Sequence, residues 1–78
     1  MKQKLKLIFP VNLIKEPVIF TMAKKYDVMP NITHARVTRT MGEMVLELEG
    51  EENNLRAGLQ SLKDQGIKVE LAGEDVIE

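Results

Sequence analysis

Strict alternation of apolar and other side chains in two short segments constrains this fold more than any other feature of the sequence. Segment 4–9, KLKLIF, and segment 43–49, EMVLELE, each carry a large apolar residue at every second position. A period of two predicts a β-strand with one face in the core. The other face is lysine-rich in the first segment and glutamate-rich in the second, and such charges suit neighbouring strands. The two segments therefore predict a sheet with one apolar face and one charged, open face.

Two stretches with helical periodicity separate the expected strands, because their apolar residues recur at three- and four-residue spacing. The first helix begins at Pro17, whose missing N–H costs nothing in a first turn, and it ends before Pro30. The second has acids at 51 and 52 in its first turn and ends at Gly66, a suitable left-handed cap. The expected buried stripes are Val18, Ile19, Met22, Ala23 and Tyr26, and then Leu55, Leu59 and Leu62.

The remaining strands are expected at 31–40 and 67–71, with a tight turn before segment 43–49 in which Gly42 supplies backbone freedom. The elements then follow the order strand, helix, strand, strand, helix, strand. This order predicts an α+β fold, the ferredoxin-like βαββαβ sandwich. Its four-stranded antiparallel sheet has strand order 4-1-3-2 and carries both helices on one face. A single domain over 1–78 is expected, with 72–78 as a loose tail.

Segment 30–34, PNITH, contains the one histidine of the chain and an N-x-T sequon. Alternation within the strand puts Thr33 on the buried face, and Ile32 and His34 on the open face. Asn31 is a natural turn residue at a strand start, where its side chain can bond its own backbone. His34 lacks the second histidine or cysteine that a convincing metal site needs, so we interpret it as a surface strand residue.

Composition excludes several classes of function. The chain has 11 lysines and arginines against 12 acids, so it offers no overall field to attract nucleic acid or an acidic membrane. Its apolar runs are far shorter than the roughly 20 residues that cross a bilayer. Without cysteine it has no disulfide or thiolate metal site. We expect a cytoplasmic chain without membrane insertion, in which the sequon is accidental.

The connection 11–17, VNLIKEP, is a second segment of interest. The unpaired amides at a helix start can hold a carboxylate or a phosphate. Every helix has such an end, however, and Glu16 adds a negative charge beside this one. No set of groups arranged for acid/base or nucleophilic chemistry can be assembled, so we do not expect an enzyme.

Four segments in sequence order together indicate a family. The chain resembles the NIL domain, a relative of the small-molecule-binding ACT domains, which is named for an Asn-Ile-Leu run at its second strand. Here that run is Asn31-Ile32-Thr33, with threonine in place of the usual leucine. The resemblance covers nearly the whole chain and rests on the segments LIFP…KEPVI, PNITHARV, GEMVLELEGEE and LKDQGIKVEL.

The resemblance points to two settings. NIL domains at the C-terminus of methionine-importer ATPases bind methionine at a domain–domain interface, and the asparagine implicated there matches Asn31. This chain is more similar to the N-terminal NIL domain of ferredoxin-type iron–sulfur proteins, which are associated with homocysteine formation. It shares with them a start at the first strand, a short turn between the second and third strands and an acidic tail. Having no cysteine, it cannot hold a cluster itself.

The leading hypothesis is a non-catalytic regulatory module, acting as a homodimer, that binds methionine or a related sulfur amino acid. No catalytic residue, metal or cofactor is expected. The alternative is a protein–protein docking domain for an iron–sulfur or sulfur-transfer partner in a homocysteine-forming system. The expected ligand-binding residues are Asn31, Ile32, Thr33 and His34.

Overall fold

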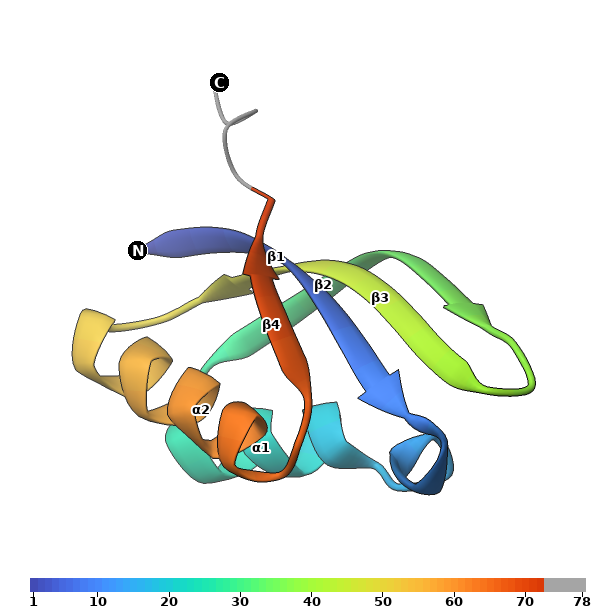
Figure 1. Cartoon of the computed structure of the whole chain (residues 1–78). Coiled ribbons are helices and arrows are strands. Elements are labelled where there is room, and N and C mark those ends of the chain that lie inside the picture. The colour runs from blue at the N-terminus through green and yellow to red at the C-terminus, as the bar shows by residue number, and fades with distance from the viewer. Residues whose placement is uncertain (73–78) are drawn as a thin grey trace.

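The four expected strands form one antiparallel sheet in the computed structural model, which describes residues 1–72 (Figure 1). The sheet order is β2-β3-β1-β4, which confirms the predicted ferredoxin-like arrangement. The strands are β1 (Lys2–Pro10), β2 (Met29–Val37), β3 (Met41–Glu49) and β4 (Lys68–Leu71). The helices are α1 (Val18–Tyr26), α2 (Glu52–Asp64) and a short 3₁₀ helix, η1 (Val11–Leu13).

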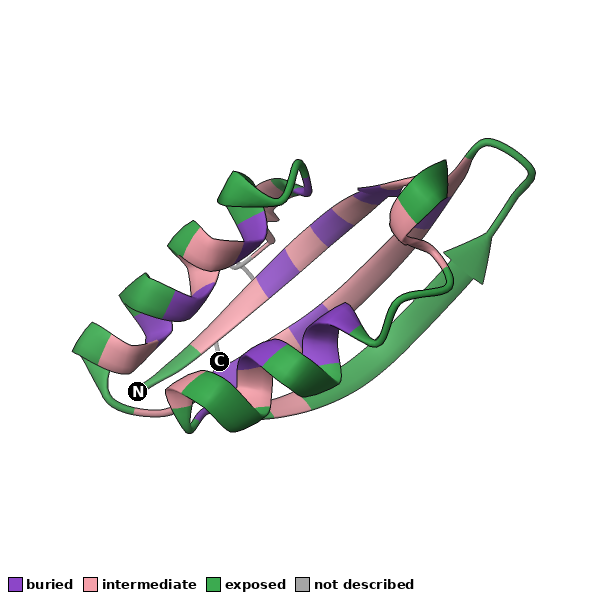
Figure 2. Ribbon diagram, turned by 90° about the horizontal axis from the view of Figure 1, so that it is seen from below, coloured by how far each residue is buried: buried purple, intermediate pink, exposed green. Residues whose placement is uncertain are grey.

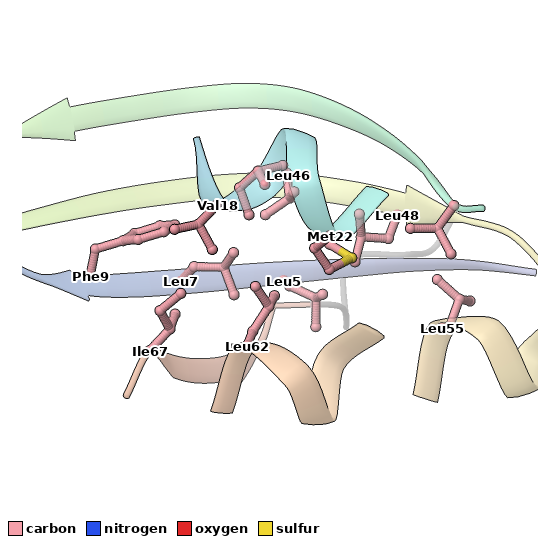
Figure 3. Packing of buried hydrophobic residues seen from close by; sticks show 12 residues of the cluster. Leu5, Leu7, Phe9, Val18, Met22, Leu46, Leu48, Leu55, Leu62 and Ile67 are labelled. Carbon is pink, nitrogen blue, oxygen red and sulfur yellow. The ribbon is translucent and has the colours of Figure 1, made fainter. Parts of the chain in front are cut away.

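Both long helices lie against one face of the sheet, and the core fills the space between them (Figure 2). Burial alternates along β1 and β3, as the period of two predicts. Figure 3 shows leucines of these two strands gathered with Met22 of α1 and Leu62 of α2. Each fully buried leucine contributes about 1.5–3 kcal/mol. The side chains with 0% exposure are Leu5, Leu7, Leu46, Leu48 and Leu62.

The two helices pack closely where α2 passes Met22 of α1. A Cβ atom at Gly58 would lie only 2.9 Å from the Met22 sulfur, so a glycine lets the helices approach. The predicted stripes are confirmed, with Ala23, Tyr26 and Leu59 half-buried at their borders.

The end of α2 follows the prediction. Gly66 has a φ of 94°, in the left-handed region that glycine occupies without strain. Its amide donates a hydrogen bond to the Lys63 carbonyl (3.0 Å), and the Ile67 amide donates to the Leu62 carbonyl (3.1 Å). These bonds satisfy carbonyls that the end of the helix would otherwise leave unpaired.

The predicted role of Gly42 is wrong. Gly42 lies inside β3, is buried, and is not among the positive-φ residues. It lies instead beneath Ile14, whose Cγ1 would be in ordinary contact, at 3.4 Å, with a Cβ at this position. The turn between β2 and β3 is stabilised by Thr38, whose amide and hydroxyl both donate to the Met41 carbonyl (2.8 and 3.1 Å).

Strand β2 also departs from the prediction, because it contains a β-bulge. Ile32 lies opposite Leu46 and His34 lies opposite Val45, so Thr33 is the extra residue. Directly opposed residues share a face of the sheet, and Leu46 is in the core. The prediction that Ile32 lies on the open face is therefore wrong.

The predicted burial of Thr33 is wrong as well. Its side chain is exposed, and its hydroxyl donates a hydrogen bond to the Val45 carbonyl (3.1 Å) across the bulge. Strand β2 also begins earlier than the predicted residue 31, so that Pro30 lies inside it. An edge strand tolerates this proline, since the ladder needs an N–H only on the side that faces β3.

Charged residues from neighbouring strands form an ionic network on the open face. The Glu43 carboxylate on β3 lies 2.8 Å from the Lys6 ammonium on β1 and 3.0 Å from the Arg36 guanidinium on β2. Hydrogen bonding from Lys6 is the main reason that the pKa of Glu43 is lowered and the pKa of Lys6 is raised. The cross-strand charge match predicted from the two alternating segments is confirmed, with Lys4 opposite Glu47 as a second pair of positions.

The expected loose tail, 72–78, lies outside the described residues apart from Ala72, whose amide donates to the Lys4 carbonyl (3.0 Å). Among the helices of residues 1–72, none combines the length and apolarity needed to span a membrane.

Candidate functional site

A hollow of about 230 Å³ surrounds Asn31 on the open face of the sheet. On β2, Asn31 lies opposite Glu47 of β3 and Met29 lies opposite Glu49 of β3. Lys2 lies opposite the same Glu49 on the other neighbouring strand, β1. The hollow thus spans the starts of β1 and β2 and the end of β3. Its lining residues are Lys2, Met29, Pro30, Asn31, Glu47 and Glu49.

The bulge brings Asn31 and His34 to the same face. In a regular strand two residues three positions apart point to opposite faces. Here the extra residue Thr33 shifts the phase, so both Asn31 and His34 lie opposite open-face residues of β3. Of the four predicted site residues, the structure therefore puts these two on one face, although only Asn31 lines the hollow, and it turns Ile32 towards the helices.

The Asn31 side chain is available to a ligand. Asn31 is exposed, and its amide makes no hydrogen bond to any of the described residues. The alternative in which this amide bonds its own backbone at a turn is therefore wrong; Asn31 lies within β2. A free side-chain amide offers two donors and an acceptor oxygen.

The charges around the hollow differ from those of the ionic network. Within residues 1–72, Lys2, Glu47 and Glu49 make no ion pair, whereas Lys6 and Arg36 both pair with Glu43. One free ammonium and two free carboxylates can complement the carboxylate and the ammonium of a zwitterion. The hollow can therefore hold a small molecule with both charges.

Met29, and not Ile32, supplies exposed apolar surface beside Asn31. Met29 is 67% exposed and shares the open face with Asn31. Its flexible thioether can adapt to an apolar side chain of a ligand.

Sequence reasoning missed Lys2, Met29, Glu47 and Glu49 as neighbours of Asn31. The alternation in segment 43–49 predicts that Glu47 and Glu49 lie on the open face, so their face could be found from the sequence. The register of β2 against β3, which brings them beside Asn31, depends on tertiary pairing.

The described residues offer no metal site. No group of three or more histidine, cysteine, aspartate or glutamate side chains in this part of the chain is placed to hold an ion. His34 is exposed on the edge strand, opposite Val45.

Comparison with known proteins identifies relatives over the same residues. The sequence model of the NIL domain matches residues 3–71. The chain is 32% identical over 68 residues to the methionine import ATP-binding protein MetN 1 of Bacillus cereus (strain ATCC 10987 / NRS 248), covering 82% of this chain and 20% of that protein. It is 34% identical over 68 residues to the protein of the same name from Bacillus anthracis, with the same coverage. The chain thus spans only about a fifth of the length of these curated relatives.

A solved structure shares the fold. It is the C-terminal domain of an ABC transporter ATP-binding protein from Enterococcus faecalis, with a TM-score of 0.77 and 24% sequence identity. The likeness covers 92% of this chain and 84% of that domain.

Proposed function

The chain belongs to the NIL domain family, and from this membership and the Asn31 hollow we propose that it is a non-catalytic module that binds methionine or a related sulfur amino acid. The single observation that carries the proposal is the free Asn31 amide, which lies among an unpaired ammonium and unpaired carboxylates in residues 1–72. Two curated relatives are named as methionine import ATP-binding proteins, which supports methionine as the first ligand to test.

Each residue of the hollow has a distinct role in this proposal. The Lys2 ammonium binds the ligand's carboxylate, and Glu47 and Glu49 bind its ammonium group. The Asn31 amide can bond either end, because it both donates and accepts. Met29 contacts the thioether side chain, which needs mainly apolar surface.

His34 and the bulge complete the site. His34 follows Asn31 along the open face of β2, beyond the lining of the hollow, and in this proposal a ligand larger than methionine would reach it. In this proposal Ile32 and Thr33 support the site without contacting the ligand. Thr33 stabilises the bulge through its hydrogen bond to the Val45 carbonyl, and Ile32 packs opposite Leu46.

Calorimetric titration with methionine and homocysteine tests the proposal. Binding of methionine should be detectable at millimolar ligand, and an Asn31→Ala variant should lose it. An Asn53→Ala variant is the matched control, because Asn53 is an exposed asparagine on α2, away from the hollow. Absence of heat with any sulfur amino acid, or equal binding by both variants, would contradict the proposal.

We also propose that the module acts as a homodimer through the free edge of β2. Ile32 is an exposed apolar residue on the helix-side face of this edge strand, in the half of β2 away from the β2–β3 hairpin. Pairing of two such segments around Ile32 would bury it and satisfy backbone groups that face solvent. A domain of 78 residues also gains stability from association.

Sedimentation velocity tests this second proposal. The chain should sediment as a dimer, and an Ile32→Asp variant should sediment as a monomer. A monomeric wild-type chain would contradict the dimer. It would favour the alternative function, in which the β2 edge docks on an iron–sulfur or sulfur-transfer protein.

A further inference from the structure

A second cavity, of about 220 Å³, lies on the helix side of the sheet at the far end of β2. It is an open cavity between the η1–α1 connection, which follows the end of β1 (Figure 1), and the β2–β3 hairpin. Asn31 lies opposite Glu47 near the end of β3, whereas Val37 lies opposite Gly42 near its start. The cavity and the Asn31 hollow are therefore on opposite faces and at opposite ends of the same strand.

The connection from Leu13 to Pro17 forms one wall of this cavity. Ile14 lies over Gly42, since a Cβ at Gly42 would meet the Ile14 Cγ1 at 3.4 Å. Ile14 thus covers this part of the sheet, and both Ile14 and the first residues of α1 line the cavity. The segment that the sequence marked as a possible anion site is thus the wall of an apolar chamber.

The lining is apolar both inside and at the mouth. Phe20 and Val37, at 67% and 65% exposure, are among the most exposed large hydrophobic residues of the described chain, and both line the cavity. Water next to such a surface makes few hydrogen bonds, and an apolar group that displaces it gains free energy. The main apolar side chains of the lining are Phe9, Leu13, Ile14, Ile19, Phe20 and Val37.

The charges at the cavity disfavour an anion. Arg36 and Glu43 also line it, but they are already paired at 3.0 Å. Of the charged lining residues, only Glu16 has no ion pair within residues 1–72. A ligand carboxylate would therefore meet a free negative charge and no free positive one.

We propose that this cavity is a binding site for a small, uncharged apolar molecule, separate from the Asn31 hollow. Apolar cavities of about 150 Å³ in proteins hold a benzene molecule. A volume of about 220 Å³ accommodates a six-membered ring with a substituent. Recognition comes from shape and apolar contact, and Glu16 selects against anionic analogues.

Methyl-resolved NMR titration with cyclohexanol and with cyclohexanecarboxylate tests the proposal. The two probes share a ring and differ in charge. Cyclohexanol should shift the methyl signals of Ile14, Ile19 and Val37, with saturation at millimolar concentration. Cyclohexanecarboxylate should bind about tenfold more weakly, because its charge would lose hydration in an apolar lining and lie near Glu16.

Two matched variants locate the site. Ala35→Leu adds a side chain at an exposed position that lines the cavity and should weaken cyclohexanol binding about tenfold. Ala57→Leu makes the same change at an exposed position of α2 outside the cavity and should leave binding unchanged. Val37→Ser removes apolar surface at the mouth and should also weaken binding, which provides a second test if Ala35→Leu disturbs the strand.

Three results would overturn the proposal. They are the absence of shifts with cyclohexanol, equal effects of Ala35→Leu and Ala57→Leu, and tighter binding of the carboxylate. If dilution alone shifts the same methyl signals and cyclohexanol does not, a second copy of the chain fills the cavity and the proposal is also wrong. Methionine shifts around Asn31 are read in a separate titration, so failure here leaves the proposed function unaffected.

Discussion

The two central strands and the edge strand β2 follow different rules. In β1 and β3 every second side chain points into the core, the opposite face is mostly charged, and the inward leucines have no exposed surface. Strand β2 is exposed at nearly every residue, contains Pro30, and is interrupted by a bulge at Thr33. Stability is therefore concentrated in the centre of the sheet, whereas the edge can vary its geometry and present side chains to a ligand.

The largest difference in the free energy of unfolding should appear when opposed residues of β3 and β2 are each replaced by alanine. Leu46 has 0% exposure and Ile32 has 49%, although they face each other across the same pair of strands. Leu46→Ala should lower the free energy of unfolding by about 2–5 kcal/mol, because it leaves a cavity in the core. Ile32→Ala should lower it by less than about 1 kcal/mol. Urea denaturation measures both, and equal losses would show that the edge contributes as much as the centre.

Removing the hydroxyl of Thr33 should lower stability less, but it should change the backbone geometry of the bulge. Thr33→Val keeps the shape of the side chain but loses the hydrogen bond to the Val45 carbonyl, which costs about 0.5–1.5 kcal/mol. We expect amide shifts at His34 and weaker methionine binding, since the bulge aligns His34 with Asn31. Unchanged His34 signals would mean that the bulge does not depend on Thr33. A Thr21→Val variant on the exposed side of α1 is the control.

The ionic network should contribute the smallest effect, and it should depend on pH. The pKa of Glu43 is lowered from its ordinary value of 4.5, mainly by the hydrogen bond from Lys6. A lowered carboxyl pKa gives a stabilising contribution that is present above pH 4.5 and is lost as the pH falls below it. Lys6 shows the opposite case, because its pKa is raised from 10.5 and its contribution is lost as the pH rises above that value.

A Glu43→Gln variant isolates this contribution. Its melting temperature should fall less steeply than that of the wild type on acidification below pH 4.5. A Glu52→Gln variant, which breaks the exposed Arg56–Glu52 pair on α2, should follow the wild-type profile more closely. Identical acid profiles of the Glu43→Gln variant and the wild type would show that the network adds nothing to stability.

The centre of the molecule could be predicted from sequence because its signals are local. Alternation in segments 4–9 and 43–49 identified the leucines that the structure buries, and Gly66 identified the end of α2. The order of elements then leaves few possible topologies, since two right-handed split β-α-β units put both helices on one face of the sheet. These features require no knowledge of the pairing register.

The edge could not be predicted in the same way. A bulge depends on how β2 pairs with β3, and an exposed strand has no buried face to fix its phase. The sequence therefore assigned Ile32 and Thr33 to the wrong faces. A glycine between two predicted strands indicates a turn, and the position of Gly42 inside β3, beneath Ile14, becomes visible only in three dimensions. Asn31 was identified through a family resemblance, whereas its charged neighbours required the register.

The most direct measurement of whether β2 presents a ligand site is a titration of ¹⁵N-labelled chain with L-methionine, followed by amide chemical shifts. We predict saturable shifts confined to the starts of β1 and β2 and the end of β3, around Lys2, Asn31 and Glu47. The signals of the Asn31→Ala variant should not respond. Shifts that cluster elsewhere, or no shifts at millimolar methionine, would contradict the account.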